Sequence, residues 1–125
     1  HREYKGISKG VKNMSDISLI VTIVRKGWGD TVLEASVKAG AHGGTILYGR
    51  GSGIHEKQKI LGIPIEPEKE IVLTVTYSDK NERILKEIVR VTDLDEPGMG
   101  IAFVVPVEKV AGVAHLAGEV AKLDL

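Results

Sequence analysis

The hydrophobic positions along the chain fall into two similar blocks, and each block reads as strand, helix and strand. The predicted elements, in chain order, are strand Ile17–Val24, helix 31–39, strand Thr45–Tyr48, strand Glu70–Tyr77, a helical stripe at Ile84, Leu85, Ile88 and Val89, and strand Ile101–Val105. This order, βαββαβ, predicts an α+β fold of the ferredoxin-like type, in which both helices cover one face of a four-stranded sheet.

Capping signals mark the ends of the predicted helices. Thr31 and Glu34 have the spacing of a capping box, in which a hydroxyl bonds an orphan amide and an acid follows three residues later. Asp79 and Glu82 repeat this spacing before the second helix. Gly40 suits the left-handed residue that ends the first helix.

The strands lack the polar alternation that a sheet with one solvated face shows. Ile17–Val24 and Ile101–Val105 are apolar at nearly every successive position, so both of their faces are expected to be buried. Two helices cover only one face of the sheet. A second copy of the chain is the simplest cover for the other face, which predicts a homo-oligomer with its sheets facing inward.

Composition excludes several classes of protein. The 125 residues suffice for one domain, and 17 basic residues balance 17 acidic ones, which argues against a general electrostatic grip on nucleic acid or an anionic membrane. The absence of cysteine excludes disulfides and thiol nucleophiles, and the longest apolar run, Ile17–Val24, is too short to span a membrane. We expect a cytoplasmic protein with no membrane insertion.

The two ends of the chain carry weaker signals. Residues 1–16 are polar without clear periodicity and are expected to form a flexible extension. A short helix is expected around Val107–Val110, and the tail 114–125 has a helical pattern from Ala114 to Leu123.

Two glycine clusters follow equivalent elements of the two blocks. The stretch Gly43–Gly53 contains five glycines and ends in Gly-Arg-Gly-Ser-Gly; it lacks the Lys-Ser/Thr of a P-loop, so it is either an anion-binding nest of backbone amides or a flexible hinge. Glu96–Gly100 precedes the last strand, where a nest and a tight turn are both open.

Between the clusters the long loop 51–69 carries His55, which is either a ligand or proton carrier or simply an exposed side chain. The histidines lack metal-ligand spacing, and no catalytic constellation is visible.

The joint spacing of these motifs resembles the PII signal-transduction family. The most specific segments are Gly43-Gly-Thr with Gly51-Ser-Gly53, similar to the strand that enters the family's T-loop, and Gly98–Glu108, similar to its B-loop and following strand. The resemblance implies a PII-like domain over 17–113, with a T-loop at 51–69 and a B-loop at 92–100. It further implies a non-catalytic homotrimer that holds ATP, ADP or AMP between subunits, has no tightly bound cofactor or metal, and regulates a transporter or metabolic enzyme.

The resemblance also implies a set of binding residues. Thr45 matches the family's adenine contact, and the glycines match residues that meet the phosphates. The expected nucleotide-binding residues are Thr45, Arg50, Gly51, Ser52, Gly53, Gly98, Met99, Gly100 and Ile101. Further candidates for phosphate or partner contacts are Arg25, His55, Lys57 and Lys59.

The chain departs from the family pattern at several of these positions. The Lys that follows the B-loop glycines is Ile101, two late Arg fall at Gly112 and Ala114, and the Gln that helps hold magnesium and 2-oxoglutarate falls at His55. The T-loop is shorter and lacks the modifiable Tyr motif. The loss of three cations argues against a bound triphosphate, because hydrogen bonds between charged groups are stronger than those between neutral groups. Two alternatives therefore stay open: a nucleotide-free trimeric module for a small anion, metal or protein partner, and a small enzyme that uses His55.

Overall fold

The structure is a computed structural model, and it describes residues 12–13, 16–53, 58–60 and 62–112. Its elements are β1 (Lys12–Asn13), β2 (Ile17–Arg25), α1 (Gly29–Lys38), β3 (Thr45–Arg50), β4 (Gln58–Ile60), β5 (Ile63–Ile65), β6 (Glu68–Tyr77), the 3₁₀ turn η1 (Ser78–Lys80), α2 (Asn81–Thr92), β7 (Gly100–Pro106) and β8 (Lys109–Val110). Elements β2, α1, β3, β6, α2 and β7 confirm the predicted βαββαβ order. No helix within these residues is long and apolar enough to cross a membrane.

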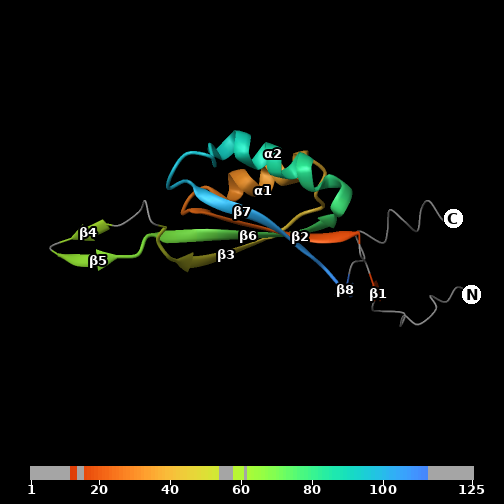
Figure 1. The fold of residues 1–125 in the computed structure, drawn as a ribbon, viewed down its shortest axis with the longest axis horizontal. Helices are drawn as coiled ribbons and strands as arrows, with labels where there is room; N and C mark the ends of the chain where they lie inside the picture. The colour runs from red at the N-terminus through yellow and green to blue at the C-terminus, as the bar shows by residue number, and fades with distance from the viewer. Residues whose placement is uncertain (1–11, 14–15, 54–57, 61, 113–125) are drawn as a thin grey trace, which may run out of the picture.

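The four long strands form one antiparallel sheet in the order β3-β6-β2-β7. Figure 1 shows α1 and α2 together on one side of this sheet, with the β4–β5 hairpin projecting beyond the end at which β6 begins. The fold is therefore the two-layer, ferredoxin-like sandwich that the sequence predicts.

The layer between sheet and helices is the hydrophobic core. Alternate residues of the central strands, such as Ile20 and Val24 in β2 and Val72 in β6, are at most 1% exposed. They pack with Val32 of α1 and Ile88 of α2 in one cluster. Because successive side chains of a strand point to opposite faces, the intervening residues lie on the far face of the sheet.

That far face, which we call the open face, is almost entirely apolar. Its apolar residues include Leu19, Val21 and Ile23 of β2, Leu47 of β3, Ile71, Leu73 and Val75 of β6, and Ile101, Phe103 and Val105 of β7. Exposed fractions reach 45% for Leu47, 56% for Ile101 and 42% for Phe103. The missing polar alternation thus corresponds to a face that the helices leave uncovered.

Both predicted helix starts are wrong, whereas the predicted end of α1 is confirmed. Helix α1 begins at Gly29 with Trp28 as N-cap and no side-chain cap bond, so Thr31 and Glu34 do not form a capping box. Helix α2 is entered through η1, which places Asp79 in the 3₁₀ turn and not at the N-cap. Gly40 has φ +118° and ends α1, as predicted.

Other features of the structure also differ from the prediction. Strand β6 begins at Glu68, two residues earlier than expected, and part of the T-loop forms the β4–β5 hairpin. The helix expected at Val107–Val110 is wrong, because Lys109–Val110 is strand β8 and pairs with β1. The pairing of Lys12–Asn13 also gives part of the expected flexible extension a defined place. The predicted helical tail lies outside the described residues.

Candidate functional site

The candidate residues at the base of the T-loop, Gly51–Gly53, and those of the B-loop, Gly98–Gly100, lie at the same end of the sheet. Strand β3 finishes there at Arg50, which pairs with Glu68, while β7 begins at Gly100, which pairs with Val24. In Figure 1 this is the end that carries the β4–β5 hairpin and the connection from α2 to β7. The antiparallel order therefore places the T-loop base and the B-loop at the same end.

The two clusters nevertheless lie at opposite edges of the sheet. Strands β6 and β2 separate β3 from β7. With neighbouring strands about 4.8 Å apart, this separation is roughly 14 Å. Gly51–Gly53 and Gly98–Gly100 therefore do not form one site within a single chain.

The B-loop is a tight turn with two glycines in the left-handed region. After α2, Glu96 N–H donates to the Asp93 carbonyl at 2.9 Å and Met99 N–H donates to the Glu96 carbonyl at 3.3 Å. Gly98 has φ +81° and Gly100 has φ +140°. The two hydrogen bonds form a tight turn, and positive φ at both glycines is compatible with a turn and with a nest.

Gly100 is required by a close approach within the chain itself. A Cβ at this position would lie 2.2 Å from the carbonyl oxygen of Ile23 in the neighbouring strand β2. Ile101, which follows, is opposite Ile23 and points to the open face. Its side chain is therefore directed away from the helix layer.

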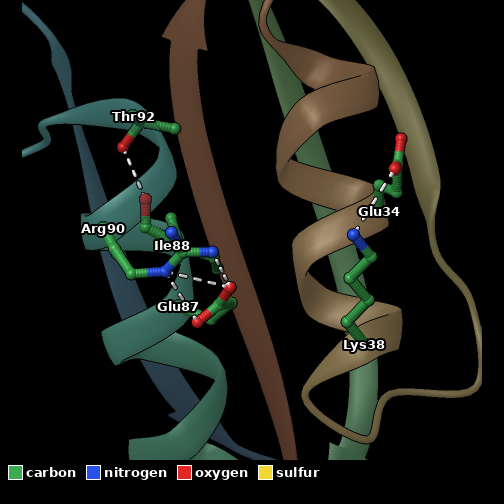
Figure 2. Close-up of polar contacts among 6 residues, drawn as sticks. All are labelled: Glu34, Lys38, Glu87, Ile88, Arg90 and Thr92. Atoms are coloured by element: carbon green, nitrogen blue, oxygen red, sulfur yellow. Dashed lines mark hydrogen bonds and ion pairs between the residues drawn. The ribbon is translucent and has the colours of Figure 1, made fainter.

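The last turn of helix α2, which leads into the B-loop, contains hydrogen bonds from the side chains of Thr92 and Arg90. Thr92 Oγ1 donates to the Ile88 carbonyl at 2.7 Å, and Arg90 bonds the carboxylate of Glu87 (Figure 2). That hydrogen bond lowers the pKa of Glu87 and raises the pKa of Arg90. On α1, Lys38 pairs with Glu34 at 3.9 Å, also drawn in Figure 2.

At the base of the T-loop, the geometry of Gly51 is that of a hinge and not of an anion-binding nest of amides. Its φ lies outside the left-handed region, a Cβ added to it would meet no atom within 4 Å, and its N–H donates to the Pro67 carbonyl at 3.1 Å. That amide therefore closes the loop instead of facing an anion. Arg50, Ser52 and Gly53 are exposed beside it.

The remaining candidates are placed only in part. Thr45 is exposed on the open face at the other end of β3, about 17 Å from Arg50 at the usual rise of a strand. A ligand that touched both would lie along the β3 edge. Lys59 belongs to β4, whereas His55 and Lys57 lie outside the described residues.

The turn between β2 and α1 contacts both loops. Arg25 Nε donates to the Gly98 carbonyl at 2.9 Å. Lys26 Nζ lies 2.9 Å from Glu68 Oε2, at the start of β6. The hydrogen bond between these two side chains raises the pKa of Lys26 and lowers the pKa of Glu68, so the pair stays charged around neutral pH.

Glu70 is a structural residue of this end that the sequence patterns missed. Its Oε1 accepts from Gly29 N–H at 2.7 Å and its Oε2 accepts from Gly27 N–H at 3.0 Å. The residue is 8% exposed, and a Cβ on Gly29 would lie 2.3 Å from Oε1. A carboxylate from β6 thus satisfies amides at the start of α1, where negative charge is favoured. The feature of the sequence that could have indicated this role is an acidic residue inside an otherwise apolar strand.

We expect a Glu70→Ala variant to lose about 2 kcal/mol of free energy of unfolding, because two amide donors lose their charged partner. Urea denaturation followed by circular dichroism measures this loss. Glu66→Ala is the matched control, since Glu66 is an exposed acid of the preceding segment. Equal stability of the two variants would show that the Glu70 bonds contribute nothing to the fold.

Metal-ligating clusters are not found in the described part of the chain. No group of three or more His, Asp or Glu side chains there could hold a metal ion. The arrangement offers instead two backbone loops with flanking cations at opposite edges of one sheet end.

Comparison with known families decides what this arrangement belongs to. The family described as "Nitrogen regulatory protein P-II" matches residues 17–115. The chain belongs to this family. A P-II protein is a regulatory signalling protein, in agreement with the resemblance carried by the glycine motifs. A search of curated proteins found no match.

Solved structures agree with the P-II assignment. The chain is similar to Arabidopsis thaliana PII bound to citrate, with 27% identity, a TM-score of 0.61, and coverage of 79% of this chain and 84% of the other. The GlnK–ATP complex of B. subtilis is 18% identical, with a TM-score of 0.59 and coverage of 78% and 86%. CutA from Synechococcus elongatus is 14% identical, with a TM-score of 0.63 and coverage of 87% and 91%. The last two similarities concern the fold alone.

Proposed function

We propose that this P-II protein is a non-catalytic, cytoplasmic sensor that binds an adenine nucleotide between the subunits of a homotrimer. The observation that carries the proposal is the position of the two glycine loops, at the same end of the sheet but on opposite edges. Around a closed ring of copies, the β3 edge of one chain faces the β7 edge of the next. Each cleft would then combine one chain's T-loop base with its neighbour's B-loop.

The open face supplies the driving force for this assembly. Apolar side chains from all four strands share it, including Phe103 and Val105, which are 42% and 39% exposed in the single chain. Contiguous apolar surface on this scale marks an interaction site. Packing three such faces against one another buries them and brings the sheet edges into contact.

The glycine loops support a phosphate ligand at the B-loop. Gly98 and Gly100 both have positive φ, a feature of the loops in which backbone amides form anion-binding concavities. Arg50 and the T-loop lysines would supply charge from the neighbouring chain. Because Ile101 stands in place of the family's Lys, we propose ATP, ADP or AMP without preference for the triphosphate.

Ligand binding is proposed to act on a partner through the T-loop. Phosphate contacts at the loop base would favour one conformation of residues 51–69, and that conformation would dock on a transporter or metabolic enzyme. The β4–β5 hairpin projects beyond the sheet, in a position suited to such docking (Figure 1).

Isothermal titration calorimetry with ATP, ADP and AMP tests the nucleotide. We expect heat from at least one of them, with saturation at one ligand per chain. Each cleft is shared by two neighbouring chains, so a closed trimer has as many clefts as chains. Absence of heat from all three at millimolar ligand would refute nucleotide binding. Native mass spectrometry of gently purified protein adds the subunit count and any co-purified ligand.

A nucleotide-free anion-binding trimer is the second candidate. The absence of three of the family's phosphate-binding cations favours it, since Ile101, Gly112 and Ala114 stand at their positions. Citrate, the ligand of the Arabidopsis PII structure, is the probe for this candidate. Heat with citrate and none with any nucleotide would select it over the sensor.

A further inference from the structure

Arg25 is placed to act on the B-loop from within the same chain. It is the last residue of β2, the strand that lies between β6 and β7. Its Nε donates to the carbonyl oxygen of Gly98, which is 73 positions later in the sequence, at 2.9 Å. The resemblance made Arg25 a candidate for a phosphate or partner contact, and the structure shows the Gly98 carbonyl as the partner of its Nε.

The peptide unit between Gly98 and Met99 is held at both of its polar atoms. Arg25 bonds its oxygen, and its N–H donates to the Glu96 carbonyl at 3.3 Å. In a trans peptide these two atoms point in opposite directions, so the two bonds together fix the rotation of the peptide plane. A rotation of this plane would break both bonds.

The orientation of this plane determines the backbone on either side. Gly98 and Gly100 adopt φ +81° and +140°, which glycine reaches without steric cost but does not by itself prefer over other conformations. Glycines this close to a peptide unit leave that unit free to rotate unless another group holds it. Arg25 is such a group, and it is anchored at the end of a central strand.

We propose that Arg25 is a positioning residue that fixes the backbone of the Gly98–Gly100 turn for a phosphate group, acting through the Gly98 carbonyl and not by contact with the phosphate. The inference rests on the proposed function, because it names what prepares the B-loop for its ligand. Its physical basis is preorganisation: a loop already held in the binding conformation loses less entropy when the ligand arrives.

The test compares Arg25→Met with Arg90→Met. Both variants remove one arginine whose Nε makes an exposed hydrogen bond, but the Nε of Arg90 bonds Glu87 on its own helix (Figure 2). We expect Arg25→Met to weaken ADP binding about tenfold, equally at low and high salt, and Arg90→Met to leave it within about twofold. Amide exchange of Met99 in the ligand-free protein should accelerate in Arg25→Met only.

An Arg25→Lys variant separates positioning from charge. Lysine keeps the charge but lacks the planar Nε–H, so positioning predicts a loss of affinity similar to that of Arg25→Met. Full affinity in Arg25→Lys, or an effect of Arg25→Met that disappears at high salt, would show a direct phosphate contact and overturn the inference. Unchanged ADP affinity in Arg25→Met overturns it as well. Failure of the unmutated protein to bind any nucleotide refutes instead the proposed function.

Discussion

A Phe103→Glu variant is expected to fold as a monomer and to lose nucleotide binding. Phe103 lies on β7 in the open face and is 42% exposed in the single chain, so a carboxylate there is tolerated by the monomer. Burial of the same charge against neighbouring chains costs several kcal/mol per subunit, so the variant is expected not to assemble. Light scattering should report three times the 13.5 kDa chain mass for the unmutated protein and a single chain mass for the variant.

Val37→Glu is the matched control for this experiment. Val37 is 47% exposed, but it lies on α1, in the layer opposite the open face. The same change of an apolar residue to an acid should therefore leave the assembly intact. A trimeric Phe103→Glu variant would show that the open face is not the interface, and a monomeric Val37→Glu variant would show that the helices take part in assembly.

A Gly100→Ala variant is expected to lose about 3 kcal/mol or more of free energy of unfolding, together with nucleotide binding. Two costs add at this position: φ is +140°, and the new Cβ would approach the Ile23 carbonyl oxygen to 2.2 Å. The oxygen belongs to the backbone of the adjacent strand, so it cannot move aside without breaking the pairing of β2 with β7. Urea denaturation and calorimetry with ADP measure the two losses.

Gly27→Ala separates the two costs. Gly27 also has a left-handed φ, +98°, but nothing lies within 4 Å of a Cβ built there. We expect this variant to lose about 1 kcal/mol, the cost of the backbone conformation alone. If Gly100→Ala is no less stable than Gly27→Ala, the close approach to Ile23 has no energetic consequence.

The patterns that depend on neighbours in sequence predicted the fold correctly. The alternation of strand and helix, and the glycine that ends α1 with φ +118°, are decided by local sterics and by burial of one helix face. The absence of polar alternation in Ile17–Val24 predicted that both faces of β2 are buried. In the single chain the helices bury one face, whereas Leu19, Val21 and Ile23 on the other face are only partly buried.

The helix starts failed because their partners are distant in sequence. The amides of Gly27 and Gly29 bond Glu70, which lies 41 positions after Gly29, and no local capping pattern records such a bond. The same holds for the B-loop, where the need for Gly100 comes from the carbonyl of Ile23. Arg25 was recognised as a candidate cation, but only the packing of β2 beside β7 gave it a carbonyl partner.

The order of the elements, the missing polar alternation of β2 and β7 and the family motifs can all be seen in the sequence. The position of Gly51–Gly53 and Gly98–Gly100 on opposite edges of one sheet end, with Arg25 and Lys26 contacting the two sides, appears only in the folded chain. Local preferences fix where strands and helices occur, whereas strand order is fixed by long-range pairing. Strand order therefore determines that a site built from both clusters requires a second chain.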